Sequence, residues 1–207
     1  QVDADCYSNQ TGSIDVKVDG GVLPYSFQWK NSKASNISNS QNLTNAGKEK
    51  YYLIVTDYYS CQEQTVLIEI DEPDRLVASI DSFLNVDCKS NNTGKMTTNI
   101  VGGNGGNQYL WINNLSDTIT KQQNLYDALA GTYHFYVTDS LGCMDSLKSK
   151  VITEPDTLII KNIAITNVDC YGNNTGSVQV DVSGGTTAYS FQWTDSAGSI
   201  VQTNEDL

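Results

Sequence analysis

The sequence predicts an all-β protein made of tandem Ig-like β-sandwich modules, which repeat with an 82-residue period and follow one another as an extended rod. Two observations predict this: residue types recur at a fixed spacing, and short stretches of alternating apolar and polar residues are separated by turn signals. No segment has the periodicity of a helix. The elements that recur at this period are Cys6, Cys88 and Cys170, Trp29, Trp111 and Trp193, and Gly20-Gly21, Gly102-Gly103 and Gly184-Gly185.

The 207 residues hold about two and a half copies of this unit. We predict module 1 at residues 1–73, a complete module 2 at 74–155 and module 3 at 156–207. Val2 matches Leu84 under the 82-residue shift, so module 1 is expected to lack the start of its first strand. Module 3 stops before position 225, where the repeat would place the counterpart of Cys143. We therefore interpret the sequence as a fragment of a longer protein.

Module 2 illustrates the expected strands. An apolar strand begins at residues 76–80, and the turn Asn-Asn-Thr-Gly follows at 91–94. The next strand alternates through Met96, Thr98 and Ile100, which predicts one buried face. An aromatic strand at 109–111 and an Asn- and Ser-rich loop at 113–124 follow.

Residues 130–139 form the next expected strand, with Tyr133, Phe135 and Val137 on one face. A glycine two residues before Tyr133 resembles the tyrosine corner of Ig-like sandwiches, although Gly47 lies four residues before the equivalent Tyr51. A last strand ends at residue 152. The expected core residues are Trp29, Trp111, Trp193, Tyr51 and Tyr133.

The cysteines are expected to form one disulfide within each module. The repeat pairs Cys6 with Cys61 and Cys88 with Cys143, and leaves Cys170 without a partner in the sequence. Such a bond stabilises by about 4 kcal/mol on the chain-entropy model and implies an oxidising, extracytoplasmic location. Buried free thiols are the alternative. Zinc is disfavoured, because the sequence has no Cys-x-x-Cys and one histidine.

The charge excludes some partners. The sequence carries 24 acidic and 12 basic residues, a net charge of −12, so little is available to neutralise phosphates. We expect no nucleic acid partner and no docking on an anionic membrane surface. No apolar run approaches the ~20 residues of a membrane span, so membrane insertion is not expected.

The motifs occur in a fixed order. Cys-x-x-x-x-Thr-Gly is followed by an alternating strand, Gly-Gly, aromatic-x-Trp, Gly-x-Tyr-x-x-x-Val-Thr-Asp, a second cysteine and Glu-Pro. This order resembles the SprB repeat of very large cell-surface adhesins of gliding bacteria. Departures are Ser60 where Gly142 stands and Asn107 where Tyr25 stands.

The resemblance implies a filament on the bacterial outer surface that is exported by type IX secretion and used in gliding motility and surface attachment. The partners it implies are neighbouring repeats of the same chain, the gliding and secretion machinery, and an external surface or polysaccharide. The alternative is a static spacer, stalk or matrix fibre that displays another functional domain.

No enzyme activity is expected. His134 is the only histidine, and the shift places Tyr52 at the same position in module 1. A catalytic base would hardly occur in one copy of a repeat, so we interpret His134 as an outward strand residue. The sequence also lacks Gly-x-Ser-x-Gly, His-Glu-x-x-His and a Gly-rich phosphate loop.

No cofactor is expected, with calcium as the one chemical alternative. Carboxylates recur in register and could converge on a hard cation at a module junction; in module 2 the candidates are Asp87, Asp139, Glu154 and Asp156. No EF-hand spacing is present, and Asp139 also sits where an Asx side chain would cap a turn.

Surface modification and ligand recognition are further hypotheses. Asn9, Asn91 and Asn173 begin Asn-x-Thr sequons, for which turn chemistry is the alternative explanation. A pattern similar to a bacterial O-glycosylation motif, Asp-Ser/Thr before an aliphatic residue or Ala, occurs at Thr118, Ser140, Ser146, Thr157 and Ser196. Tyr58, Tyr59 or the Asn/Ser-rich loops could contact a surface or a glycan; the alternative is a solvated loop.

Overall fold

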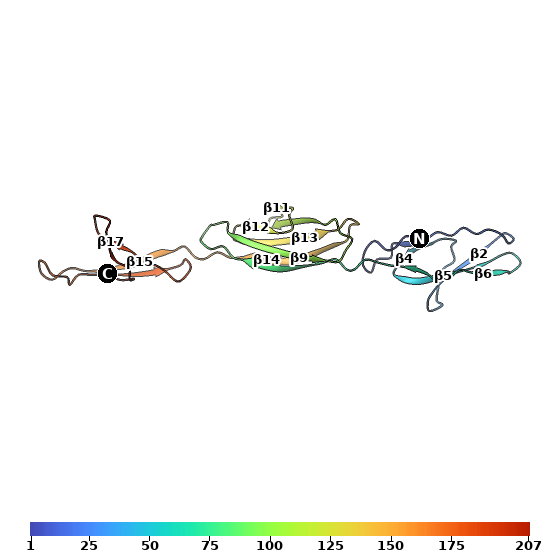
Figure 1. Cartoon of the computed structure of the whole chain (residues 1–207), viewed down its shortest axis with the longest axis horizontal. Coiled ribbons are helices and arrows are strands. Elements are labelled where there is room, and N and C mark those ends of the chain that lie inside the picture. Colours follow the sequence, from blue (N-terminus) through green and yellow to red (C-terminus); the bar gives the residue numbers. More distant parts are fainter.

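The computed structural model describes residues 1–207, apart from the side chain of Asn162. Within these residues the chain forms strands and no helix, which confirms the all-β prediction. Accordingly, the described part of the chain contains no apolar helix of membrane-spanning length. Figure 1 shows three groups of strands that follow one another along the long axis.

The strands of module 1 are β1 (Gly12–Ile14), β2 (Ser26–Asn31), β3 (Asn36–Ser38), β4 (Leu43–Ala46), β5 (Glu49–Thr56), β6 (Gln62–Gln64) and β7 (Ile68–Ile70). Module 2 contains β8 (Val77–Leu84), β9 (Gly94–Val101), β10 (Gln108–Asn113), β11 (Thr118–Thr120), β12 (Leu125–Ala128), β13 (Gly131–Thr138) and β14 (Met144–Ile152). Module 3 contains β15 (Ile159–Thr166), β16 (Ser177–Ser183), β17 (Trp193–Thr194) and β18 (Ile200–Gln202).

Module 2 is a sandwich of two antiparallel sheets. One sheet has the order β11-β10-β13-β14 and the other β12-β9-β8, which is an Ig-like arrangement of four strands on three. Both sheets contribute to one core, which consists of Leu76, Ala78, Val86, Met96, Trp111, Leu125, Ala128, Tyr133, Phe135, Val137 and Ile152. The predicted sandwich is therefore present.

Alternation decides which side chains enter this core. Along β13, Tyr133, Phe135 and Val137 are buried, whereas Tyr136 is exposed. Trp111 lies opposite Phe135 in the register of β10 and β13, and their ring centroids are 4.7 Å apart. Such an aromatic pair adds about 0.5–1.5 kcal/mol to the effect of area burial.

Module 1 is built in a similar way around Trp29, with β3-β2-β5-β6 and β7, which also pairs with β5, in one sheet and β1-β4 in the other. The pairing of β2 with β5 places Trp29 opposite Leu53, and both are fully buried. The indole N–H of Trp29 donates to the carbonyl of Gln41 at 3.2 Å, as Trp111 donates to Gln123 at 3.2 Å.

The tyrosine corner is present in both modules. The hydroxyl of Tyr51 donates to the carbonyl of Gly47 at 3.1 Å, and that of Tyr133 donates to Leu129 at 2.9 Å. Each acceptor lies four residues upstream and is a backbone oxygen. The bond therefore does not depend on a glycine at a particular position, which explains why the glycine spacing differs between the modules.

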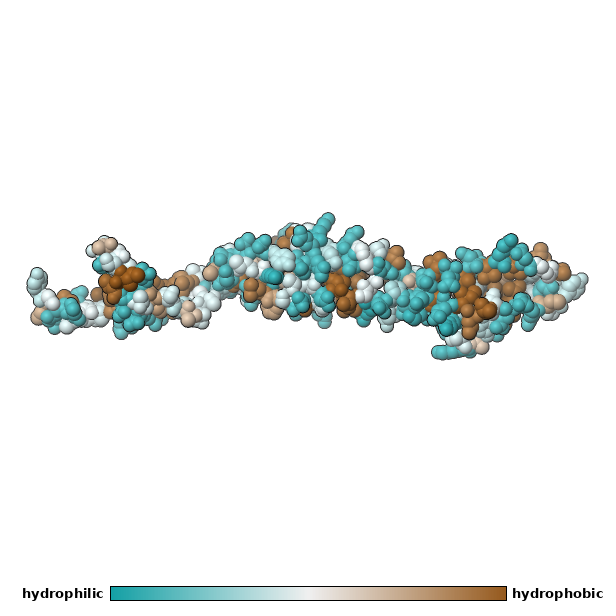
Figure 2. Space-filling view, viewed as in Figure 1, coloured by the Kyte–Doolittle hydropathy of each residue, from teal (hydrophilic) through white to brown (hydrophobic). Residues whose placement is uncertain are grey.

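Module 3 corrects one expectation about the core. Trp193 is only partly buried, because residues 156–207 contain no counterpart of β13 or β14 to cover it. The absence of these two strands also leaves Ile160, Ile163 and Ile165 of β15 63–67% exposed. Figure 2 shows an apolar patch on module 3.

We predict that Trp111→Ala lowers the free energy of unfolding of module 2 by about 3–5 kcal/mol, because it leaves a large cavity between the sheets. Trp193→Ala is the matched control and should cost much less, since its side chain is already partly in solvent. Urea titrations followed by far-UV circular dichroism measure both. Equal losses in the two variants would contradict this assignment of the core.

Candidate functional site at the module junction

The junction begins with a loop that presents the first cysteine of each module. In module 1, Asp5 accepts hydrogen bonds through Oδ1 from Thr11 Oγ1 at 2.7 Å and from Asn9 Nδ2 at 3.0 Å, and its own amide donates to Thr11 at 3.0 Å. The same bonds recur around Asp87 and Asp169. Asp-Cys-x-x-Asn-x-Thr is thus a closed turn that fixes the cysteine in place.

These bonds also set the charge of the turn. The hydrogen bond from Thr11, followed by that from Asn9, lowers the pKa of Asp5 below its ordinary value. The pKa values of Asp87 and Asp169 are lowered in the same way by Thr93 and Thr175. The three carboxylates are therefore ionised at neutral pH and act as hydrogen-bond acceptors.

The glutamate of the Glu-Pro linker holds the cysteine turn from the other side. Glu72 accepts the amide of Ser8 at 2.6 Å, and Glu154 accepts the amide of Ser90 at 2.8 Å and pairs with Lys89. Ser8 and Ser90 have positive φ values of 59° and 62°. The linker and the turn are thereby tied together at both junctions.

The facing loops of module 2 are organised by Asp139, which is 5% exposed. Its Oδ2 accepts the backbone and side-chain N–H groups of Asn104 at 2.8 and 2.9 Å, and its Oδ1 accepts the amides of Leu141 and Cys143 at 3.0 and 2.9 Å. Burial raises the pKa of this carboxyl, but the bonds from Asn104, Cys143 and Leu141 outweigh it, so the pKa lies below the ordinary value.

A disulfide joins the two halves of the junction. Cys6 of module 1 is bonded to Cys143 of module 2, with Cα atoms 5.6 Å apart and a sequence separation of 137. Beside it, Asn104 Nδ2 donates to the carbonyl of Asp5 at 2.8 Å. Asp139 therefore positions both Asn104 and Cys143 against the Asp5-Cys6 turn.

The predicted pairing within each module was wrong: Cys61, Cys88 and Cys170 are exposed free thiols. Cys6 lies in a turn near Gly47, where β5 is about to begin, and Cys61 follows the end of β5. A strand of eight residues is about 26 Å long, far beyond the reach of a disulfide. The two cysteines of a module consequently lie at opposite ends of its sandwich.

The calcium candidates do not form a ligand cluster. Asp87, Asp139 and Glu154 accept hydrogen bonds from the turns described above, and the backbone carbonyl of Asp156 accepts the amide of Gly185 at 2.7 Å. Among the described residues, no group of three or more His, Cys, Asp or Glu is arranged to hold a metal ion.

The residues proposed for modification lie on the surface. Thr118, Ser140, Ser146, Thr157 and Ser196 are all exposed. Asn9, Asn91 and Asn173 of the sequons donate to the aspartates of their turns at 3.0, 3.1 and 2.8 Å. These hydrogen bonds give the sequon asparagines a structural role.

The remaining candidates are separate from one another. His134 lies in β13 between the buried Tyr133 and Phe135, and its side chain is partly exposed. Tyr58 and Tyr59 are 64% and 71% exposed, and their rings meet edge to face at 5.2 Å. They precede Cys61 at the outer end of module 1.

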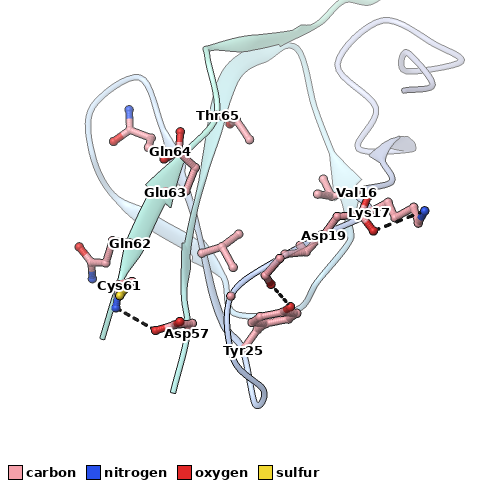
Figure 3. A pocket seen from close by; sticks show the side chains of 14 residues that line it. Val16, Lys17, Asp19, Tyr25, Asp57, Cys61, Gln62, Glu63, Gln64 and Thr65 are labelled. Atoms are coloured by element: carbon pink, nitrogen blue, oxygen red, sulfur yellow. Dashed lines mark hydrogen bonds and ion pairs between the residues drawn. The ribbon is translucent and has the colours of Figure 1, made fainter. Parts of the chain in front are cut away.

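Module 1 also has a cavity of about 560 Å³, lined among others by Val16, Tyr25, Val55 and Thr65 (Figure 3). The 82-residue shift carries residues 16–21 of its lining onto 98–103. In module 2, residues 98–101 pair with residues 77–80 of β8. The cavity is thus the place that a first strand occupies in module 2, which explains it without a ligand.

We predict that a single cut between the modules leaves them covalently joined. Arg75 is the only arginine and is exposed between Pro73 and β8. After the free thiols are alkylated and the chain is unfolded without reductant, an arginine-specific protease should leave one species on a non-reducing gel. Reduction should then release residues 1–75 and 76–207.

Cys143→Ser is the control for this cut and should give two fragments with or without reductant. Two fragments from the unaltered chain on the non-reducing gel would instead favour pairing within modules and contradict the Cys6–Cys143 bond.

We predict that Asp139→Asn lowers the free energy of unfolding of module 2 by about 1–3 kcal/mol at pH 7, because the new amide group faces N–H donors. The folded pKa is lowered, so this stabilisation is present above the ordinary pKa of about 3.8 and is lost as the pH falls through the folded value. The difference between variant and parent should therefore shrink below about pH 4. Asp127→Asn, at an exposed position of β12, is the control and should change the free energy of unfolding little. A difference that persists unchanged in acid would contradict the role of the ionised carboxylate.

Comparison with known proteins finds a matching family model and several similar solved structures. None of the curated proteins compared with the chain matches it. Among solved structures, an amphioxus IgVJ-C2 molecule is similar with a TM-score of 0.35 and 11% identity, over 72% of this chain and 99% of that one. The family model that matches is the SprB repeat, at residues 1–34 and 162–198. These two segments contain the Cys6 and Cys170 turns. The match to the SprB repeat therefore includes the turns that present the first cysteine of modules 1 and 3.

Proposed function

We propose that the chain is a repeat segment of a secreted, filamentous cell-surface adhesin that is used in gliding motility and surface attachment. The observation that carries this proposal is the match of the SprB repeat to residues 1–34 and 162–198. A shift of two repeat periods, 164 residues, carries residues 1–34 onto 165–198, which lies within the second segment. The family model therefore recognises the same part of the module twice.

The chemistry of the junction supports export. A bond between Cys6 and Cys143 persists in an oxidising environment, such as the outside of a bacterial cell, and is rare where thiols are kept reduced. Export by type IX secretion and a location on the outer surface belong to this proposal.

The role of the segment is mechanical. Figure 1 shows the modules end to end, and the disulfide fastens the end of module 2 to module 1, so tension passes through a covalent bond at this junction. The partners we propose are neighbouring modules of the same chain, the gliding and secretion machinery, and an external surface or polysaccharide. No enzyme activity or resident cofactor forms part of the proposal.

A static spacer, stalk or matrix fibre is the second candidate. The observation that favours it is that the recurring polar groups of the module hold its own turns: Asp5, Glu72 and Asp139 all accept hydrogen bonds from neighbouring loops. A module built in this way serves equally to hold another domain at a distance from the cell.

Live imaging of the source cells with a fluorescent Fab against module 2 separates these functions. A motile adhesin predicts label that travels along the surface of gliding cells. A Fab against an immobile outer-surface protein is the control. Label that stays fixed on cells that glide would reject the motile adhesin and leave the stalk or fibre.

A further inference from the structure

We propose that disulfides cross every module junction in register: the first cysteine of each module bonds to the second cysteine of the module that follows. The rule assigns partners to Cys61, Cys88 and Cys170, which are exposed free thiols in this chain. The rule rests on the geometry of the two junctions and does not depend on the proposed role in gliding motility.

The first junction shows the rule directly. Cys6 is the first cysteine of module 1 and Cys143 the second of module 2, and they are bonded. Each sits in a turn with a left-handed residue, Ser8 with φ 59° and Gly142 with φ 88°. Ser90 and Gly172 occupy the position of Ser8 in modules 2 and 3, and Ser60 occupies the position of Gly142 in module 1; all three have positive φ values. The loops that present the cysteines are therefore alike in every copy.

The second junction repeats the contacts of the first. Thr186 Oγ1 donates to the carbonyl of Asp87 at 3.1 Å, as Asn104 Nδ2 donates to the carbonyl of Asp5 at 2.8 Å. Both contacts join residues 99 positions apart. Different side chains thus make the same bond, so the packing of one module on the next is what recurs. Cys88 directly follows Asp87, as Cys6 follows Asp5, and is placed to meet a second cysteine of module 3.

The linker is held against the following module in the same way at both junctions. Gly103 N–H donates to the carbonyl of Asp74 at 2.9 Å, and Gly185 N–H donates to that of Asp156 at 2.7 Å. A Cβ at Gly102 would lie 2.0 Å from the Arg75 carbonyl oxygen, and one at Gly184 would lie 2.0 Å from that of Thr157. The Gly-Gly pair therefore permits the linker backbone to approach the following module closely. This close packing fixes the linker and, with it, the distance between the facing turns of the two modules.

The outer end of module 1 corresponds to the side of module 2 that faces module 1 at the first junction. Tyr58 and Tyr59 correspond to Ser140 and Leu141 under the repeat, and Leu141 lines a cavity of about 290 Å³ with Ala4 and Pro73 at the first junction. The two tyrosines are 64% and 71% exposed and lie beside Cys61. The occupant we assign to this end is a preceding module of the same type, whose first cysteine would bond to Cys61.

The bond forms by oxidation of two thiols. Each cysteine loses its proton and the pair loses two electrons to a disulfide-containing oxidant, which is reduced to a dithiol while the new S–S bond forms. The three free thiols are all exposed, so such an oxidant can reach them.

The test supplies module 3 with its missing strands. A copy of residues 126–152 is appended to the full chain, which places the copied Cys143 at position 225. The extended chain is oxidised with a glutathione buffer, the free thiols are alkylated, and the bonds are mapped by mass spectrometry of unreduced peptides. We expect two bonds, Cys6–Cys143 and Cys88 to the copied cysteine, with Cys61 and Cys170 alkylated.

The pairing of the copied cysteine decides the proposal. A bond from it to Cys170 would show pairing within the module and overturn the rule, as would a copied cysteine that remains alkylated in a folded chain. The matched control carries serine at the copied position and should leave Cys88 fully alkylated while Cys6–Cys143 persists.

A second variant avoids dependence on the folding of a completed module 3. Residues 1–155 are followed by a copy of residues 74–155, so that the third module is the one with a complete core. Cys88 should then bond to the copied Cys143, and the copied Cys88 should remain free. Failure of this bond in a chain whose circular dichroism shows folded modules would overturn the proposal even if the first variant does not fold.

Discussion

The covalent bond between Cys6 and Cys143 is the constraint on which the arrangement of the modules depends. Each of the first two sandwiches has its own core around one tryptophan, and the linker between them is short. The disulfide fastens the turn of Asp5 to the loop of Asp139. The hydrogen bond from Asn104 to the carbonyl of Asp5 lies beside this disulfide. Modules 1 and 2 are thereby joined covalently at two places, the linker and the disulfide, which restricts their relative motion.

This pairing has a mechanical consequence that pairing within modules would lack. The Cys6–Cys143 bond encloses residues 7–142, so a pull on the two chain ends bypasses this whole segment. At about 3.6 Å per extended residue, roughly 490 Å of chain is withheld from stretching. Pairing of Cys6 with Cys61 and of Cys88 with Cys143 would leave the linker and the strands beside it outside any loop. A bond across the junction keeps the two modules covalently joined even where their noncovalent contacts separate.

The sequence was sufficient for the sandwich and insufficient for the disulfide, and one physical reason explains both outcomes. Alternation at positions such as Tyr133 and Phe135, together with the recurring tryptophans, identifies the face of a strand that a second sheet can cover, because side chains alternate between the two faces of a sheet. The period cannot distinguish the two pairings, because a bond across the junction and a bond within a module differ in sequence separation by one whole repeat. The parity of the strands could have done so: β1 to β5 lie between Cys6 and Cys61, and an odd number of antiparallel strands ends at the opposite end of a sandwich. Trp193 was misjudged for a different reason, since its burial requires strands that residues 156–207 do not contain.

The recurring acidic residues fit the same account. As a sequence pattern they suggested either a cation site or turn capping, and the structure shows Asp87 and Asp139 accepting hydrogen bonds in turns. Their pKa values are lowered by N–H and O–H donors of the protein itself, so the ionised form is the one that organises the loops. The turns that these carboxylates close are the turns that present the cysteines. A carboxylate at these positions thus acts on the junction through the geometry of the thiol beside it, and the acidic residues and the cysteines recur together because they form one structural unit.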